Sequence, residues 1–70
     1  MPVEVFQTNI NDLGQAEELR KLLLQHFPGS RINFDLQDCD RILRVEASAV
    51  YPDKIIAVLR SQQAHCRVLE

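Results

Sequence analysis

The chain has 70 residues, of which 46% are hydrophobic and 26% are charged, a composition that predicts one small folded domain and excludes a disordered chain. Ten acidic residues against eight basic ones give a net charge of −2, which argues against nucleic acid as a partner because phosphate binding needs a basic surface. The sequence shows neither an apolar run long enough to span a bilayer nor a basic, apolar leader, so we expect a cytoplasmic domain that does not insert into membranes.

The first half of the chain predicts a strand followed by a helix. Residues 3–10 mix β-branched and aromatic residues with polar spacers, which is typical of a half-buried strand, here with a bend or bulge near Gln7. A helix is expected over residues 12–27, because Asp12 can cap its start and Gln15 follows at the spacing of a capping box. Its apolar residues recur every three or four positions and are Leu13, Ala16, Leu19, Leu23 and Phe27.

The second half predicts a hairpin, a helix and a last strand. Residues 31–36 alternate between apolar and polar side chains, a polar turn follows, and residues 41–47 form the partner strand. A helix begins near Pro52 and continues to about residue 63, and residues 65–69 alternate again. This order predicts an α+β, ferredoxin-like βαββαβ fold, in which a four-stranded antiparallel sheet with strand order 4-1-3-2 carries two helices on one face.

The alternation also assigns residues to the two faces of the sheet. The residues expected to form one core with the helices are Leu19, Leu23, Phe27, Ile32, Phe34, Leu36, Leu43, Val45, Ile56 and Leu59. The opposite face is expected to contact water and to carry Glu4, Asn33, Asp35, Arg44 and Glu46, with Ile42 as an apolar residue among them.

Two segments carry a resemblance to a known family. Residues 8–11, TNIN, lead into the first helix, and residues 35–47, DLQDCDRILRVEA, combine Asp-Leu, a turn, Asp-Arg-Ile-Leu and Val-Glu. With a βαββαβ frame over residues 1–70, they resemble the heavy-metal-associated domain, the family of copper chaperones and of the amino-terminal domains of metal-pumping ATPases. That family holds its metal between the two thiolates of Met-x-Cys-x-x-Cys.

Laid onto this sequence, the metal motif has lost both of its thiolates. Ile10 takes the methionine position, and Asp12 and Gln15 take the positions of the two cysteines. The resemblance therefore predicts a non-enzymatic binding or interaction module that keeps the scaffold, needs no cofactor and uses Asp12 as a helix cap.

The resemblance places the partner surface at the loop end of the domain, where the family meets its partners. The residues expected there are Asn9, Asn11, Asp38 and Asp40. The acidic turn suits a basic patch on a protein partner. The two open edges of the sheet also allow self-association, which leaves open a small-molecule-binding regulatory domain that works as a dimer.

A metal-handling protein with an atypical site is the other alternative. Asp12, Cys39, His65 and Cys66 all belong to loops or strand ends at one end of the predicted sheet. The strand order places strand 1 between strands 3 and 4, so a disulfide between Cys39 and Cys66 is not expected. The sequence has no Cys-x-x-Cys, no Gly-rich phosphate loop and no Ser/His/Asp arrangement, and we therefore expect neither a zinc site nor a catalytic site.

Overall fold

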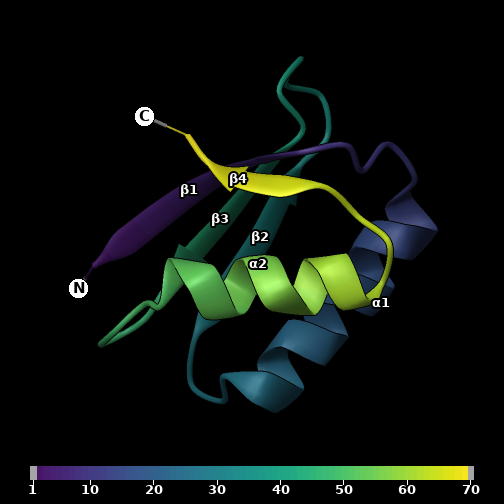
Figure 1. Cartoon of the computed structure of the whole chain (residues 1–70). Helices are drawn as coiled ribbons and strands as arrows, with labels where there is room; N and C mark the ends of the chain where they lie inside the picture. Colours follow the sequence, from purple (N-terminus) through teal and green to yellow (C-terminus); the bar gives the residue numbers. More distant parts are fainter. Residues whose placement is uncertain (1, 70) are drawn as a thin grey trace.

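The computed structural model describes residues 2–69 and contains the elements in the predicted order (Figure 1). They are β1 (Val3–Thr8), α1 (Leu13–His26), β2 (Arg31–Asp35), β3 (Ile42–Glu46), α2 (Pro52–Ser61) and β4 (Cys66–Val68). Each element lies within the range expected from the sequence and is slightly shorter at its ends. The fold is therefore α+β with βαββαβ order, and no helix within residues 2–69 is long and apolar enough to cross a membrane.

The strands form one antiparallel sheet in the order β2-β3-β1-β4, which is the predicted order read from the other edge. β1 pairs with β3 through consecutive residues up to Gln7 opposite Ile42. No bulge interrupts this pairing at Gln7, so that expectation is wrong. The short β4 pairs with the second half of β1, where Cys66 lies opposite Thr8. β2 and β4 are the two edges of the sheet.

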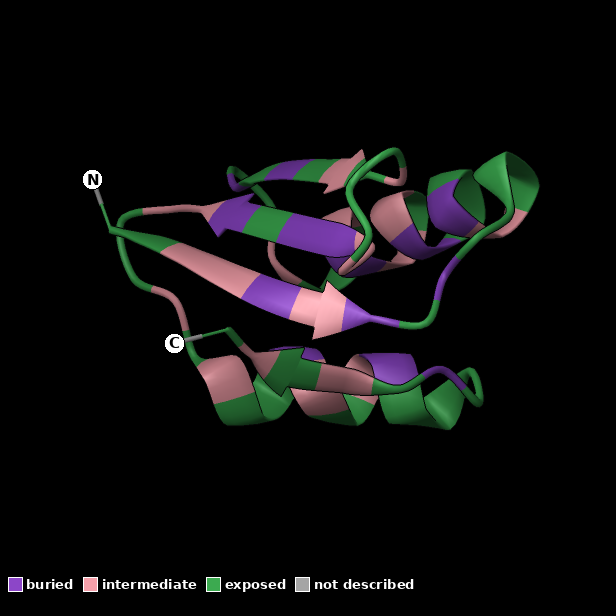
Figure 2. Ribbon diagram, turned by 90° about the horizontal axis from the view of Figure 1, so that it is seen from above, coloured by how far each residue is buried: buried purple, intermediate pink, exposed green. Residues whose placement is uncertain are grey.

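Both helices cover the same face of the sheet and leave the other face open (Figures 1 and 2). Glu4 lies opposite Val45, which is buried, so Glu4 shares the covered face and its expected place on the open face is wrong. The fully buried Phe6 determines which side of β1 faces the helices. Val3 and Val5 lie on the open side, opposite Glu46 and Arg44.

The open face otherwise carries the polar residues expected on it, which are Asn33, Asp35, Arg44 and Glu46. Ile42 also lies on this face, opposite Gln7, yet it is only 7% exposed. The hairpin turn before it folds against the end of β1, where the Gln7 Nε2 group donates to Asp40 Oδ1 at 3.0 Å. The turn is therefore fastened to β1 beside Ile42.

The core lies between the covered face and the two helices. Its buried residues are Phe6, Ile10, Ala16, Leu19, Leu23, Ile32, Leu43, Val45, Ile55, Leu59 and Ala64. Four residues expected in it, Phe27, Phe34, Leu36 and Ile56, are only partly buried and pack against its margin. Leu13 is 78% exposed, because it is the first residue of α1 and the start of this helix extends past the strand ends (Figure 2).

Candidate functional site

The loop between β1 and α1 contains Ile10 and Asp12, two of the positions that the resemblance aligns with the metal motif. Ile10 is fully buried, and its backbone N–H donates to Thr8 Oγ1 at 3.2 Å. Asp12 is the N-cap of α1: its backbone is extended, and its Oδ1 accepts the Gly14 N–H at 2.9 Å. These two side chains therefore have structural roles: Ile10 packs in the core, and Asp12 caps the start of α1.

The capping box predicted at this helix start is only half formed. The Asp12 carboxylate caps the helix as expected, but the hydrogen bonds found within residues 2–69 include no return bond from the Asp12 N–H to the Gln15 side chain. Gln15 is half-buried and lines a shallow hollow with Leu19 and Gln62. Gln15, which the resemblance aligns with the second cysteine of the metal motif, thus faces α2 rather than the cap.

The hairpin turn brings Asp38, Cys39 and Asp40 together, with one ligand atom from each lying within 4.8 Å of the others. Asp38 Oδ1 accepts the Asp40 N–H at 2.9 Å, and Asp40 Oδ1 accepts from Gln7. Within residues 2–69 this is the only group of three or more His, Cys, Asp or Glu side chains with such spacing. The two carboxylates shape the turn and attach it to β1.

His65 and Asn9, predicted at the same end of the sheet, are in direct contact. The His65 backbone N–H donates to Asn9 Oδ1 at 3.0 Å, which joins the α2–β4 connection to the β1–α1 loop. Asp12, His65 and Cys66 do not form a three-ligand group in the described part of the chain.

The end of α2 fixes the place of His65. The Gln63 N–H donates to the Arg60 carbonyl at 2.9 Å, and the Ala64 N–H donates to the Leu59 carbonyl at 3.0 Å. These two bonds, with Gln63 in the left-handed region at φ 64°, form a Schellman motif. Ala64 and Leu59 are both buried, which supplies the apolar contact of that motif and directs the chain from α2 into β4.

The two cysteines lie in different environments and are both free. Cys39 is exposed on the hairpin turn, whereas Cys66 is half-buried at the start of β4, on the covered face. Burial raises the pKa of the Cys66 thiol to about 12, so this group is a neutral thiol near neutral pH. Since soft metals bind the thiolate, the structure makes Cys66 a poor metal ligand.

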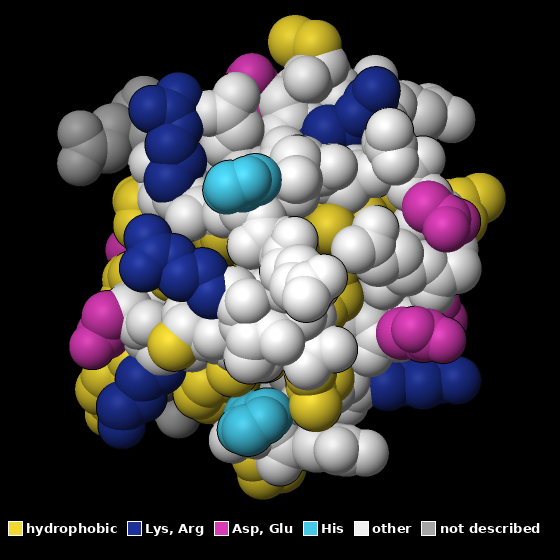
Figure 3. All heavy atoms as spheres, turned by 45° about the vertical axis from the view of Figure 1, so that its right-hand side comes forward, with side chains coloured by type: hydrophobic (Ala, Val, Ile, Leu, Met, Phe, Trp, Pro, Cys, Tyr) yellow, Lys and Arg dark blue, Asp and Glu magenta, His cyan; other side chains and the backbone are white. Residues whose placement is uncertain are grey.

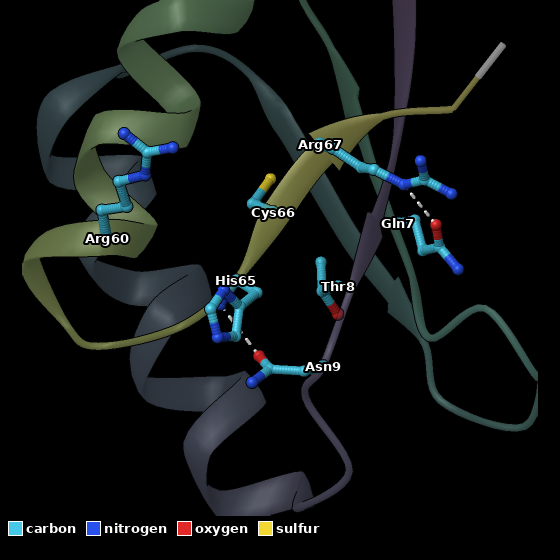
Figure 4. A pocket seen from close by; sticks show the side chains of 7 residues that line it. All are labelled: Gln7, Thr8, Asn9, Arg60, His65, Cys66 and Arg67. Carbon is cyan, nitrogen blue, oxygen red and sulfur yellow. Dashed lines mark hydrogen bonds between the residues drawn. The ribbon is translucent and has the colours of Figure 1, made fainter.

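A hollow of about 260 Å³ opens beside β4 (Figure 4). Its lining residues come from the end of β1, the last turn of α2 and the start of β4, and they are Gln7, Thr8, Asn9, Arg60, His65, Cys66 and Arg67. Arg67 is held in place, because its Nε–H donates to Gln7 Oε1 at 2.6 Å. The lining contains two arginines and a histidine and no carboxylate.

Basic side chains flank a histidine on one side of the molecule in Figure 3, although the chain as a whole carries a net charge of −2. Sequence reasoning placed His65 and Cys66 at this end but missed Arg60 and Arg67. The predicted topology could have identified these two arginines, because it puts the last turn of the second helix beside the last strand.

The chain matches no protein-family model and no curated protein. The structure shows the ferredoxin-like βαββαβ topology, and the resemblance to heavy-metal-associated domains stays an expectation from the sequence.

Proposed function

We propose that this protein is a non-enzymatic binding module, a divergent relative of heavy-metal-associated domains in which the metal loop has become part of the helix start. The observation that carries this proposal is the Asp12 carboxylate, which occupies a metal-ligand position and accepts the Gly14 N–H at 2.9 Å. Ile10, at the methionine position, is fully buried in the core. Both residues support the scaffold, and neither offers a soft ligand to a metal.

The alternative is a metal-handling protein that uses other ligands at the same end. Its best arrangement is the Asp38-Cys39-Asp40 turn, where the ligand atoms lie within 4.8 Å of one another. This arrangement combines one thiol with two carboxylates that already hold hydrogen bonds within the turn and to Gln7. Soft metals prefer sulfur and hard cations need more oxygens than two carboxylates supply, so we favour the first proposal.

The partner of such a module would meet the loop end, where Asn11 and Asp38 are exposed. Asn9 and Asp40, also expected on this surface, each use their side-chain oxygen in an internal hydrogen bond. We propose a protein partner with a basic surface, or a second copy that pairs along the β2 or β4 edge.

The metal content of untagged protein purified without chelators separates the two proposals. A binding module should contain no stoichiometric copper or zinc by elemental analysis. An equimolar metal that disappears in Cys39→Ser or Cys66→Ser would overturn our proposal and establish the metal-handling alternative. The two variants serve as controls for each other, because only Cys39 belongs to the acidic turn.

A further inference from the structure

β2 is the longer of the two open edges of the sheet, with five residues against three in β4 (Figure 2). Its inner side pairs with β3, and within residues 2–69 no backbone hydrogen bond outside that ladder involves Arg31–Asp35. Because successive residues of a strand direct their backbone groups to opposite sides, about half of those of β2 point away from the sheet. The hairpin turn leaves them uncovered, since it folds against β1 through Gln7 and Asp40.

The sequence of β2 is complementary to itself in an antiparallel pair. Arg31 and Asp35 lie two positions before and two positions after Asn33, and all three share the open face of the sheet. Pairing centred on Asn33 therefore places Arg31 opposite Asp35 of a second copy, and Asp35 opposite Arg31 of that copy. Opposite charges directly across a strand pair stabilise the pair, and the two-fold symmetry forms this contact twice.

Both charged groups are available for this contact. The Arg31 side chain is 80% exposed, and its Nε lies 4.0 Å from Glu46 Oε1, which is too far for a hydrogen bond. Asp35 is exposed, and its Oδ1 accepts the Gln37 N–H at 3.2 Å, which leaves the second carboxylate oxygen for another donor. In the pair, Arg31 would lie between Glu46 of its own chain and Asp35 of the second copy.

The covered side of the same edge is apolar. Phe34 is only partly buried, and with Leu13 and Ala16 it lines a hollow of about 270 Å³ between β2 and the start of α1. Leu13 is 78% exposed. The register centred on Asn33 places Ile32 opposite Phe34 of the second copy, so pairing gives Phe34 an apolar neighbour on the side that a single copy leaves to water.

The β4 edge lacks this complementarity. Arg67 is the middle residue of β4, and an antiparallel pair centred on it would place Arg67 opposite Arg67 of a second copy. Like charges directly opposite each other destabilise a strand pair. Of the two open edges, β2 is therefore the one suited to pairing with a second copy.

We propose that this chain forms a two-fold symmetric dimer by antiparallel β2–β2 pairing centred on Asn33, which joins the two sheets into one continuous sheet. The placement of Arg31 and Asp35 on either side of Asn33 carries this proposal. Backbone hydrogen bonds supply the attraction, and the two Arg31–Asp35 contacts fix the register. The inference rests on the proposed role as a binding module and names a second copy as its partner.

The test is sedimentation equilibrium of the untagged wild type and two charge variants, each over a range of protein concentrations. Arg31→Glu places two carboxylates opposite each other, and Asp35→Lys places two cations opposite each other. Each variant should weaken the dimer about tenfold or more, because the symmetry changes both contacts at once. An equimolar mixture of the two variants should recover the dimer, since each strand then supplies the charge that the other needs.

Arg67→Glu is the matched control, because it reverses the charge of an arginine on the other edge strand, and its dimer should be as stable as that of the wild type. A wild type that stays monomeric up to millimolar concentration would overturn the proposal. So would a mixture that does not recover the dimer, or a dimer that responds to Arg67→Glu and not to Arg31→Glu. Such failures concern the partner alone, whereas stoichiometric metal in the purified protein would refute the binding-module role itself.

Discussion

The Asp12 side chain caps the start of α1. The first turn of a helix has backbone N–H groups without intrahelical partners. A side chain just before the helix can accept a hydrogen bond from one of them. In this protein the Asp12 carboxylate accepts the Gly14 N–H. The cap was predictable from sequence because an acid before an apolar helical stripe is a local signal. The missing return bond from Gln15 was not, because it depends on how that side chain packs near α2.

Replacing Asp12 with Ala should destabilise the protein by about 0.5–2 kcal/mol, because the Gly14 N–H loses its acceptor. Asp12→Asn keeps an acceptor oxygen and removes the charge, so it should recover most of the loss. Urea denaturation of the wild type and both variants measures the free energy of unfolding. If Asn were as destabilising as Ala, the negative charge and not the acceptor would stabilise this helix start.

Cys66 makes stability depend on pH in the alkaline range. Burial raises its pKa from 9.0 to about 12, so the unfolded chain loses the thiol proton at a lower pH than the folded protein does. The stabilising contribution is complete below pH 9, and it is lost as the pH rises from there towards 12. Above pH 9 the free energy of unfolding should therefore fall more steeply in the wild type than in Cys66→Ala.

Cys39→Ala is the control for this pH dependence, because Cys39 is exposed and the other alkaline groups are the same in both variants. Its free energy of unfolding should follow the wild-type pH profile. Equal slopes in the wild type and in Cys66→Ala would show that the thiol is more accessible to water than the structure indicates.

At the scale of elements, the α2–β4 junction combines a regular motif with an unusual residue. The Schellman motif places a left-handed residue after the helix, and glycine is the usual choice because it has no Cβ. Here Gln63 occupies this position at φ 64°. The junction is nevertheless retained, since it buries Ala64 against Leu59 and places the His65 N–H against Asn9.

Gln63→Gly should therefore stabilise the protein, by about 0.4–1 kcal/mol, because glycine relieves the left-handed strain by more than it adds entropy to the unfolded chain. Thermal unfolding followed by circular dichroism should show a higher midpoint. The neighbouring Gln62, at φ −102°, provides the matched control, and Gln62→Gly should lower the midpoint. A lower midpoint in Gln63→Gly would mean that the Gln63 side chain contributes contacts that outweigh its strain.

The elements themselves were predictable because their signals are local. Strict alternation identified β2 and β3, and the three-to-four spacing identified α1. The face of β1 was not predictable in this way, because Val3 and Val5 alternate as well as Phe6 and Ile10 do. Packing decided between them, since Phe6 fills the core and is fully buried. Leu13 was misassigned for a related reason: it fits the helical stripe but precedes the part of α1 that packs on the sheet.

At the scale of the whole molecule, the hollow beside β4 joins residues that are far apart in the chain. Gln7 and Arg67 meet at 2.6 Å across 60 positions, and Asn9 meets His65 across 56. The topology predicted that these segments share one end of the sheet. Which side chains form hydrogen bonds there depends on their rotamers and on the β1–β4 register, which the sequence pattern does not give. A net charge of −2 also does not show that the lining of this hollow includes two arginines and no carboxylate.

We propose above all that the β1–α1 loop lies where the family has its metal loop, and that Asp12 and Gln15 stand in place of the two metal-binding cysteines. A competitive copper(I) titration of the wild type beside Asp12→Cys/Gln15→Cys tests this most directly. The double variant places two thiols at Cys-x-x-Cys spacing at the start of α1 and should bind one equivalent of copper(I) tightly, whereas the wild type should not. A wild type that binds one equivalent as tightly, or a folded double variant that binds none, would contradict the proposal.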